Sequence, residues 1–294
     1  MLFPMSDLTI IIPAYNEEVS LKHFLPAVLS FCEEKKINLI IVNDGSKDGT
    51  QKVLENFSAH SCLKSIRNKI NKGYGGSIKA GISAAETKYV ITIDADGQHY
   101  LEDVEKLYNE IVSNDADMII GSRKGQPNSS YYRGMGKSLI RGIAKLLMPM
   151  DVYDINSGMK IYDTVLAKKY LPLYPDSMAF SDTIALVFIS QRHHVLEIPI
   201  QIRKRVGGKS TISTITAFET IKQILNIVVL FNPMRIFFPL SVFFIIASIA
   251  WGLPIILTGK GVSVGAMLGI VTGIFFFFFG LVAEQLSLLR KGKL

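Results

Sequence analysis

The sequence predicts an α/β domain with a mostly parallel sheet, followed by a hairpin of two transmembrane helices. Two observations lead to this prediction. In the front part of the chain, short runs of β-branched residues alternate with helical patterns, which is typical of a parallel sheet covered by helices on both faces. Near the end of the chain, residues 236–259 and 261–283 form runs of 24 and 23 residues without a charged side chain.

The strands expected in the front part are short and nearly all apolar, as in strands that are buried on both faces. They cover residues 8–12, 39–42, 89–93 and 118–120. Apolar residues recur at helical spacing between and after them, at about residues 21–32, 49–57, 75–85 and 101–112. Pro26 lies inside the first of these patterns, so that helix should be kinked or begin late. The alternation predicts one three-layer domain over residues 1–235.

The two uncharged runs are long enough to cross a membrane, because a bilayer core of roughly 30 Å needs about 20 helical residues. We expect helices at about 236–258 and 262–284, with a short basic tail completing a segment that spans 236–294. Only residues 259–261 join the runs, so both ends of the pair must face the same side. Lys and Arg residues flank the pair on that side, whereas Lys260 stands alone at the turn. This asymmetry predicts an integral membrane protein whose front domain and C-terminus are cytoplasmic.

Two segments before the hairpin are expected to be helices at the membrane surface, at about 133–148 and 213–231. In the first, basic residues recur every four positions beside an apolar face, at Arg133, Lys137, Arg141 and Lys145. The alternative is an ordinary helix with a solvated basic face, and the nearby membrane runs favour the interfacial interpretation. The second segment is rich in Ile and Val and fits an interfacial or a core helix.

Charge and cysteine content exclude several classes of protein. The net charge of +7 is mild for a nucleic-acid-binding protein, and no recognition motif supports one, so we expect no nucleic-acid partner. Cys32 and Cys62 form neither a CxxC motif nor a Cys/His cluster, which predicts no disulfide framework and no zinc site. The first residues lack the basic and apolar stretches of a signal peptide.

Polar clusters follow three of the expected strands. They are Pro-Ala-Tyr-Asn-Glu-Glu at 13–18, Asn-Asp-Gly-Ser at 43–46 and Asp-Ala-Asp-Gly-Gln-His at 94–99. Each cluster alone could be a turn or a helix cap. Because ligands of such sheets bind at the carboxyl ends of the strands, three clusters at one edge predict a binding site there.

Asp94 and Asp96 stand where the third polar cluster leaves the sheet. Two carboxylates this close repel each other unless a cation lies between them or one takes up a proton. Together with Gln98 they offer the hard oxygen ligands that suit Mg²⁺ or Mn²⁺, which usually bind through one or two carboxylates plus substrate phosphates. A metal acting as Lewis acid would then stabilise a diphosphate leaving group.

A glycine-rich turn, Asn-Lys-Gly-Tyr-Gly-Gly-Ser, occupies residues 71–77. It opens a helix and could offer backbone N–H groups to an anion, or it could be a tight turn with close helix packing. Ile78 stands where a dinucleotide-binding fingerprint needs glycine, so the pattern disfavours an NAD site.

In this order and spacing, the motifs resemble glycosyltransferase family 2 with the GT-A fold, and within it the dolichol-phosphate mannose synthase type. They are Ile-Ile-Pro-Ala-Tyr-Asn-Glu-Glu (11–18), Val-Asn-Asp-Gly-Ser-Lys-Asp-Gly-Thr (42–50), the glycine-rich turn and the cluster at 94–99. Residues 154–160, Asp-Ile-Asn-Ser-Gly-Met-Lys, resemble that group's Asp-x-x-Ser-Gly-Phe-Arg element. Residues 202–210 resemble its basic loop ahead of the membrane.

The resemblance implies roles for individual residues. It implies that the donor nucleotide sugar is bound by Pro13, Tyr15, Glu17, Asp44, Asp94, Arg205 and Lys209. It implies that the metal is held by Asp94, Asp96 and Gln98, and that the acceptor phosphate is bound by Arg123, Arg133 and Ser157. Catalytic roles fall to Asp94, Asp96, Arg123, Arg133 and Asp154. Met159-Lys160 in place of Phe-Arg, and Asn43 in place of the commoner Asp, depart from the family pattern.

The resemblance implies inverting transfer of a hexose from a UDP- or GDP-linked donor to a polyprenyl phosphate, dolichyl or undecaprenyl, at the cytoplasmic membrane face. It also suggests self-association. A hydroxyl acceptor would need a general base, whereas a phosphate monoester with a second pKa near 6 is already largely dianionic at pH 7, so basic positioning groups could replace the base. The alternatives are a processive polysaccharide synthase and an inactive nucleotide-sugar-binding scaffold. The first usually carries Gln-x-x-Arg-Trp, but the single tryptophan, Trp251, lies in a membrane run.

Overall fold

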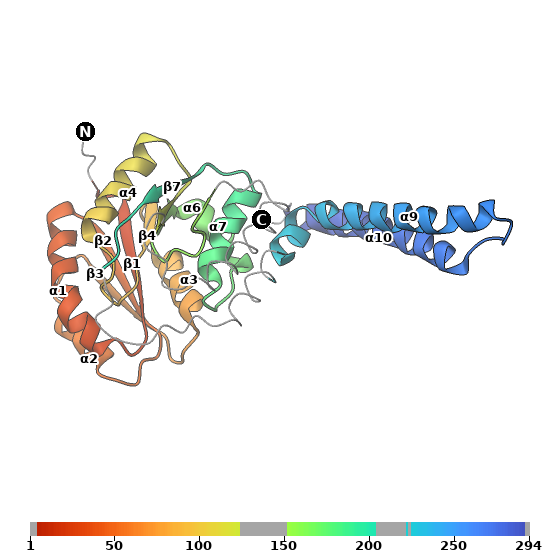
Figure 1. Ribbon diagram of the computed structural model, residues 1–294. Helices are drawn as coiled ribbons and strands as arrows, with labels where there is room; N and C mark the ends of the chain where they lie inside the picture. Colours follow the sequence, from red (N-terminus) through yellow and green to blue (C-terminus); the bar gives the residue numbers. More distant parts are fainter. Residues whose placement is uncertain (1–4, 124–151, 204–221, 223–224, 292–294) are drawn as a thin grey trace. The chain divides into compact units, whose positions relative to one another are not determined.

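The computed structural model describes residues 5–123, 152–203, 222 and 225–291. It divides into two compact units, one formed by residues 1–142 and 150–223 and the other by residues 143–149 and 224–294. Figure 1 shows the sheet and helices of the first unit and the long helices of the second. Each unit is described by itself.

A seven-stranded sheet forms the centre of the first unit, in the order β3-β2-β1-β4-β6-β5-β7. The strands are β1 (Leu8–Ala14), β2 (Asn38–Asn43), β3 (Leu63–Arg67), β4 (Tyr89–Thr92), β5 (Met118–Ser122), β6 (Lys160–Asp163) and β7 (Val195–Pro199). All neighbours pair in parallel except β6, which runs antiparallel to both β4 and β5. The expected mostly parallel α/β sheet is therefore confirmed, with one reversed strand that the sequence pattern did not reveal.

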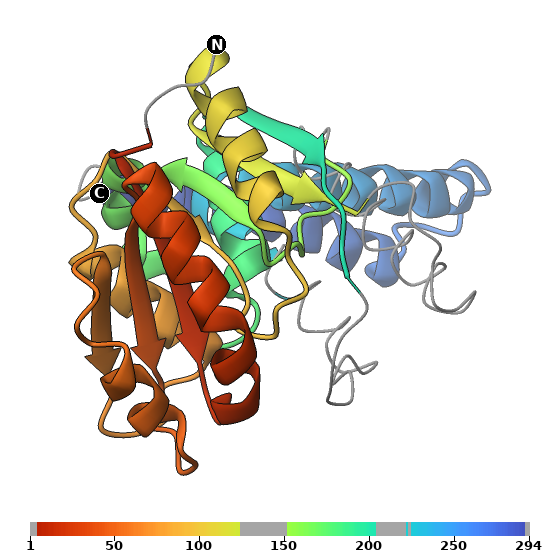
Figure 2. The same ribbon diagram turned by 90° about the vertical axis from the view of Figure 1, so that its left-hand side faces the viewer.

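Helices cover both faces of this sheet. They are α1 (Glu18–Lys35), α2 (Thr50–Asn56), α3 (Tyr74–Ala84), α4 (Leu101–Ser113), α6 (Thr164–Lys169), the 3-10 turn η1 (Leu171–Leu173) and α7 (Phe180–Ser190). Figures 1 and 2 show α1 and α4 on one face and α3, α6 and α7 on the other. α1 begins at Glu18 and runs through Pro26, so the expected late start is wrong.

The main core lies between the sheet and the α1/α4 layer. Alternate strand residues such as Ile10, Ile12 and Ile91 point into it and are fully buried. On the opposite face α3 approaches β1 closely, because a Cβ atom at Gly81 would lie 2.5 Å from Cγ2 of Ile11. This two-sided burial explains the continuous apolar runs of the central strands.

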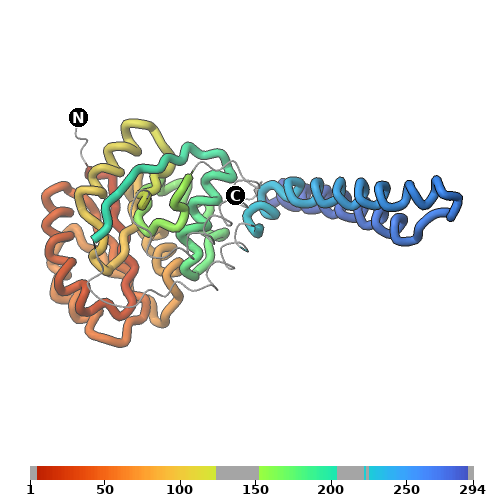
Figure 3. The backbone as a smooth tube through the Cα atoms, in the orientation of Figure 1, coloured from red at the N-terminus to blue at the C-terminus, as the bar shows by residue number. Residues whose placement is uncertain are grey.

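Two long apolar helices, α9 (Met234–Leu257) and α10 (Val264–Lys291), form a hairpin in the second unit, as Figure 3 shows. Both are long and apolar enough to cross a membrane by length and composition. The predicted two-helix C-terminal hairpin is confirmed. Before it, residues 225–231 are helical; the rest of the expected helix at 213–231, apart from Lys222, and all of 133–148 lie outside the described residues.

Glycines of α10 allow close contact with α9. A Cβ atom at Gly273 would lie 2.6 Å from Cγ1 of Ile245, and one at Gly280 would lie 2.8 Å from Cβ of Phe237. The phenylalanine run behaves differently: Phe275 and Phe279 are exposed, at 58% and 60%. The glycines of the second helix therefore serve close helix packing, whereas most of the phenylalanines face outward.

Candidate active site

The carboxyl ends of β2, β1 and β4 lie side by side, because these three strands are parallel neighbours. The polar clusters at 43–46, 13–18 and 94–99 follow these strands and therefore meet at one edge of the sheet. The reversed β6 adds a fourth segment: its first residue, Lys160, pairs with Thr92 near the same edge. The 154–160 element thus reaches the site because β6 is antiparallel.

The loops after β1 and β2 are fastened to each other. The backbone N–H of Glu17 donates to Oγ1 of Thr50 (2.9 Å), and the N–H of Gly49 donates to Oε2 of Glu18 (2.9 Å). Asn16 has φ of +56° and accepts at Oδ1 from the N–H of Lys47 (2.9 Å). Much of the 42–50 motif therefore serves to hold the two loops together, and we call this set of bonds the clamp.

The clamp leaves Tyr15 at the surface, 42% exposed and available for ring stacking. Pro13 pairs with Val42 at the end of β1, and Glu17 accepts a hydrogen bond at Oε2 from the Ser20 hydroxyl (2.6 Å). The three residues thus lie beside the clamped loops, and their contact with a nucleoside stays a prediction.

Asp44 is almost completely buried, at 3% exposure. Its carboxylate accepts hydrogen bonds from Nδ2 of Asn68 (2.7 Å), the N–H of Lys72 (2.9 Å) and the N–H of Gly73 (2.8 Å). In this structure Asp44 therefore anchors the glycine-rich turn. Direct contact of Asp44 with the nucleoside stays a prediction.

The glycine-rich turn packs closely against a neighbouring segment of the chain, as the second of the two sequence interpretations expects. Gly73 has φ of +88°, and a Cβ atom there would lie 2.5 Å from the carbonyl oxygen of Asp176. That same carbonyl accepts the N–H of Gly76 (3.1 Å). The N–H groups of Lys72, Gly73 and Gly76 are thus used within the protein.

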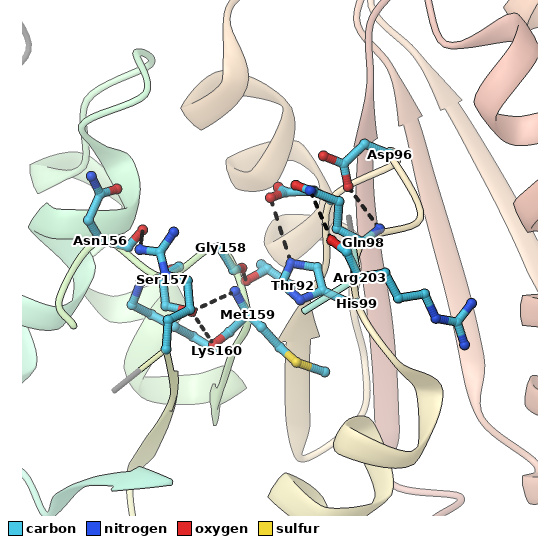
Figure 4. A network of polar contacts seen from close by, with 12 residues as sticks. Thr92, Asp96, Gln98, His99, Asn156, Ser157, Gly158, Met159, Lys160 and Arg203 are labelled. Atoms are coloured by element: carbon cyan, nitrogen blue, oxygen red, sulfur yellow. Dashed lines mark hydrogen bonds and ion pairs between the residues drawn. The ribbon is translucent and has the colours of Figure 1, made fainter. Parts of the chain in front are cut away.

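Asp94 and Asp96 lie at the start of the loop that follows β4. Figure 4 shows Asp96 on this loop, close to Gln98. Asp96 accepts at Oδ1 from the N–H of Gln98 (3.1 Å), across a turn in which Gly97 has φ of +70°. Gln98 in turn donates from Nε2 to the carbonyl of Arg203 (3.2 Å) and accepts the N–H of Arg203 (2.9 Å). The first residues of the basic loop are thereby fixed to the carboxylate turn.

Asp94 has neighbours on both carboxylate oxygens and a side chain that is 38% exposed. The Tyr74 hydroxyl donates to Oδ1 (3.2 Å), and Nε2 of His99 lies 3.7 Å from Oδ2. Burial would raise the pKa of Asp94, but His99 and the Tyr74 hydroxyl outweigh it and hold this pKa below its ordinary value. Asp94 is therefore ionised at neutral pH.

Arg123 and Asp154 form a bidentate pair. Nε of Arg123 lies 2.6 Å from Oδ2 of Asp154, and Nη2 lies 2.7 Å from Oδ1. The backbone of Asp154 is held in turn, because its N–H donates to Oε1 of Glu197 on β7 (2.8 Å). Burial would raise the pKa of Asp154, but the hydrogen bonds and charge of Arg123 lower it. Asp154 thus fixes the guanidinium of Arg123.

The turn after Asp154 packs directly against Asp94. A Cβ atom at Gly158 would lie 2.6 Å from Oδ2 of Asp94, so only glycine fits there. Thr92 donates from Oγ1 to the carbonyl of Gly158 (2.8 Å), and Lys160 donates to the carbonyl of Ser157. The Ser157 hydroxyl is buried, 3.3 Å from the N–H of Met159, so its contact with the acceptor stays a prediction.

Lys160 is a buried cation, 1% exposed, that sequence reasoning did not place in the site. Burial lowers its pKa to about 8, while the nearby carboxylates of Asp182 and Asp154 oppose that shift. Asp182 was also missed. The sequence feature that could have indicated Asp182 is its position as the single acidic residue in the largely apolar segment 180–189.

The carboxylates fit a cation that arrives together with a diphosphate. Among the residues that the structure describes, no group of three or more His, Cys, Asp and Glu side chains is arranged to hold a metal ion. Asp94 and Asp96 still offer partly exposed oxygens, and Mg²⁺ commonly takes one or two carboxylates and completes its shell with phosphate oxygens and water. Arg133, Arg205 and Lys209 lie outside the described residues.

Comparison with known proteins decides the family. The family model for glycosyl transferase family 2 matches residues 9–171, which include both carboxylates of the 94–96 turn and the Arg123–Asp154 pair. The chain belongs to glycosyl transferase family 2. A second model, the GtrB C-terminal hairpin, matches residues 232–289. The resemblance inferred from the motifs is confirmed.

Relatives within family 2 include lipid-phosphate glycosyltransferases. A dolichyl-phosphate beta-glucosyltransferase of Dictyostelium discoideum is 29% identical over 66% of this chain and 64% of its own length. A Saccharomyces cerevisiae protein of the same description is 28% identical over 76% of this chain and 73% of its own. Undecaprenyl-phosphate 4-deoxy-4-formamido-L-arabinose transferase of Edwardsiella ictaluri is 25% identical over 69% of this chain and 62% of its own length. The chain therefore spans just under two thirds of the first and third of these relatives.

Solved structures show the same fold for this family 2 domain. Glucosyl-3-phosphoglycerate synthase from Mycobacterium tuberculosis, in complex with Mn²⁺, UDP and phosphoglyceric acid, has a TM-score of 0.56 at 14% identity, covering 75% of this chain and 78% of that one. TarS of S. aureus, in complex with UDP-GlcNAc, has a TM-score of 0.53 at 16% identity, covering 76% and 66%. The predicted GT-A fold class is confirmed.

Proposed function

We propose that this protein transfers a hexose from a UDP- or GDP-linked sugar to a polyprenyl phosphate, with inversion, at the cytoplasmic face of a membrane. The observation that carries the proposal is the packing of two charged elements at one sheet edge. The 94–98 carboxylate turn suits a donor diphosphate, and the Arg123–Asp154 pair beside it suits a phosphate acceptor. Gly158 brings the two elements together, since its Cα lies against the Asp94 carboxylate.

The donor would occupy the carboxylate side of the site. Tyr15 is exposed enough to stack on a base, and Pro13 and Glu17 lie on the same loop. Asp94 and Asp96, with Gln98, would hold Mg²⁺ or Mn²⁺ with the diphosphate, and the bound metal would supply Lewis-acid stabilisation of the leaving group. Asp94 fits this part because it is ionised and partly exposed.

The acceptor would be bound by Arg123. A guanidinium binds phosphate oxygens through its planar donors, and Asp154 holds this one in a fixed plane with its side chain 36% exposed. A polyprenyl phosphate is largely dianionic at pH 7, so its oxygen can attack the anomeric carbon without a general base. Direct attack opposite the leaving diphosphate gives inversion. Arg133, Arg205 and Lys209 would add positive charge on the acceptor and donor phosphates.

The lipid acceptor agrees with the apolar hairpin. We infer that α9 and α10 span the bilayer and hold the catalytic domain at the surface where the headgroup of a polyprenyl phosphate lies. Basic residues flank both outer ends of the pair, which favours the cytoplasmic side for the domain. The relatives described as dolichyl-phosphate and undecaprenyl-phosphate transferases support the same class of acceptor.

A transfer assay with the purified full chain tests the proposal. The protein in detergent is incubated with dolichyl or undecaprenyl phosphate, Mg²⁺ or Mn²⁺ and one radiolabelled donor: UDP-glucose, GDP-mannose or UDP-N-acetylglucosamine. We expect one donor to give an organic-soluble product of one sugar per lipid phosphate, and NMR of its anomeric carbon reports inversion. Long polymers would instead support a processive synthase. Donor binding without any transfer would support an inactive scaffold, and light scattering of the same preparation tests self-association.

A further inference from the structure

Tyr74, in the middle of the glycine-rich turn, reaches from that turn to the carboxylate site. Its hydroxyl lies 3.2 Å from Oδ1 of Asp94, at the start of the loop that follows β4. In this contact the phenol is the donor and the carboxylate is the acceptor.

The backbone that carries Tyr74 is fixed on both sides. Gly73 before it donates to Asp44 (2.8 Å), and a Cβ atom on Gly75 after it would lie 2.9 Å from Cβ of Phe180. One short turn therefore contacts both Asp44, through its backbone, and Asp94, through the Tyr74 side chain. The two carboxylates follow different strands, β2 and β4, and this turn contacts both of them.

Asp94 has little freedom once Tyr74 is in place. Oδ1 faces the Tyr74 hydroxyl, while Oδ2 lies 2.6 Å from the Cβ position of Gly158. Rotation of the carboxylate would break its hydrogen bond with the Tyr74 hydroxyl, and the Gly158 backbone lies beside Oδ2. Groups that orient a metal-binding carboxylate commonly change metal affinity or activity by about 10- to 100-fold when removed.

We propose that Tyr74 is a positioning residue whose hydroxyl orients the Asp94 carboxylate for the metal–diphosphate complex. This inference rests on the proposed function, because it takes Asp94 as part of the donor site. It gives the glycine-rich turn a task other than anion binding: the turn holds Tyr74 and Asp44 at fixed positions relative to the sheet edge.

The variant Tyr74→Phe tests the inference, because it removes one hydroxyl and keeps the ring. The full chain in detergent is titrated with Mn²⁺ in the presence of UDP or GDP, and bound Mn²⁺ is followed by electron paramagnetic resonance. We expect Mn²⁺ binding to weaken about 10- to 100-fold and kcat to fall by a similar factor. The KM for polyprenyl phosphate should stay unchanged, because Arg123 is untouched.

Tyr108→Phe is the matched control, since the Tyr108 hydroxyl donates to Asp7 in another part of the same domain. This control should lower thermal stability and leave Mn²⁺ binding unchanged.

Two outcomes would overturn the inference. If the wild-type chain binds Mn²⁺ with nucleotide and Tyr74→Phe binds it equally well, the positioning role is wrong and the proposed function stands. If the wild-type chain shows no Mn²⁺-dependent binding of either nucleotide, the metal-dependent donor site and the role of Tyr74 both fail.

Discussion

Arg123 and Asp154 are joined by two side-chain hydrogen bonds of 2.6 and 2.7 Å, and a third bond runs from the backbone N–H of Arg123 to Oδ2 of Asp154 (3.1 Å). This arrangement fixes a guanidinium next to the carboxylate turn. It makes Asp154 a residue that acts through Arg123, a more specific role than the family resemblance implied.

Asp154→Asn should therefore impair use of the lipid phosphate. Asparagine keeps the shape of the side chain but loses the charge and one acceptor, so Arg123 is no longer held in one plane. We expect kcat/KM for polyprenyl phosphate to fall about 10- to 100-fold, the equivalent of a lost charged hydrogen bond. Asp163→Asn is the control, because the Asp163 carboxylate accepts the N–H of Leu166 at the start of α6. Unchanged acceptor kinetics with weaker nucleotide binding would move Arg123 to the donor site.

Asp96→Asn should abolish transfer and leave the fold intact. The amide oxygen of asparagine can still accept the N–H of Gln98, so the turn is kept. The negative charge that would hold the cation at the leaving diphosphate is lost. Circular dichroism checks the fold and the radiolabel assay checks transfer. Near-normal turnover of this variant in the presence of a chelator would refute the metal mechanism.

Lys160 should make stability depend on pH on the alkaline side. Its pKa is about 8 in the folded protein and near 10.5 when unfolded, so between these values the unfolded chain binds more protons. Below pH 8 the burial of the charged lysine lowers the free energy of unfolding. As the pH rises from 8 to 10.5, the buried lysine loses its proton and the free energy of unfolding increases. We expect the melting temperature of the wild type to rise relative to that of Lys160→Met across this window. Parallel profiles of the two proteins would show that Lys160 is not a buried cation.

The hairpin prediction concerns topology. Each of the two uncharged runs, 236–259 and 261–283, reaches about 35 Å at 1.5 Å per residue, enough for one crossing with some tilt. In a chain with Cys32 and Cys62 replaced, Lys260→Cys should react with an impermeant thiol reagent added to intact cells. Lys293→Cys should react only after permeabilisation. The opposite pattern would place the catalytic domain outside the cytoplasm.

Much of the fold could be predicted from local sequence, because the central strands are buried on both faces and read as continuous apolar runs. The apolar runs did not predict β3, β6 and β7. β3 and β7 are the edge strands of the described sheet, and their side chains are only partly buried. β6 is short and begins with Lys160, whose burial depends on carboxylates from distant parts of the chain.

The sequence by itself determined the family, the carboxylates of the 94–98 turn and the two apolar helices. Each of these depends on residues that are close together in the sequence and have a characteristic spacing. The tertiary structure decided how these residues are held. A reversed strand brings Gly158 against Asp94 and Asp154 onto Arg123, and a packed turn brings Tyr74 to the same carboxylate. Such pairings join residues that are 20 to 64 positions apart, as Tyr74–Asp94 and Asp94–Gly158 show. Local patterns carry no record of them, because the contacts form only when the sheet is assembled.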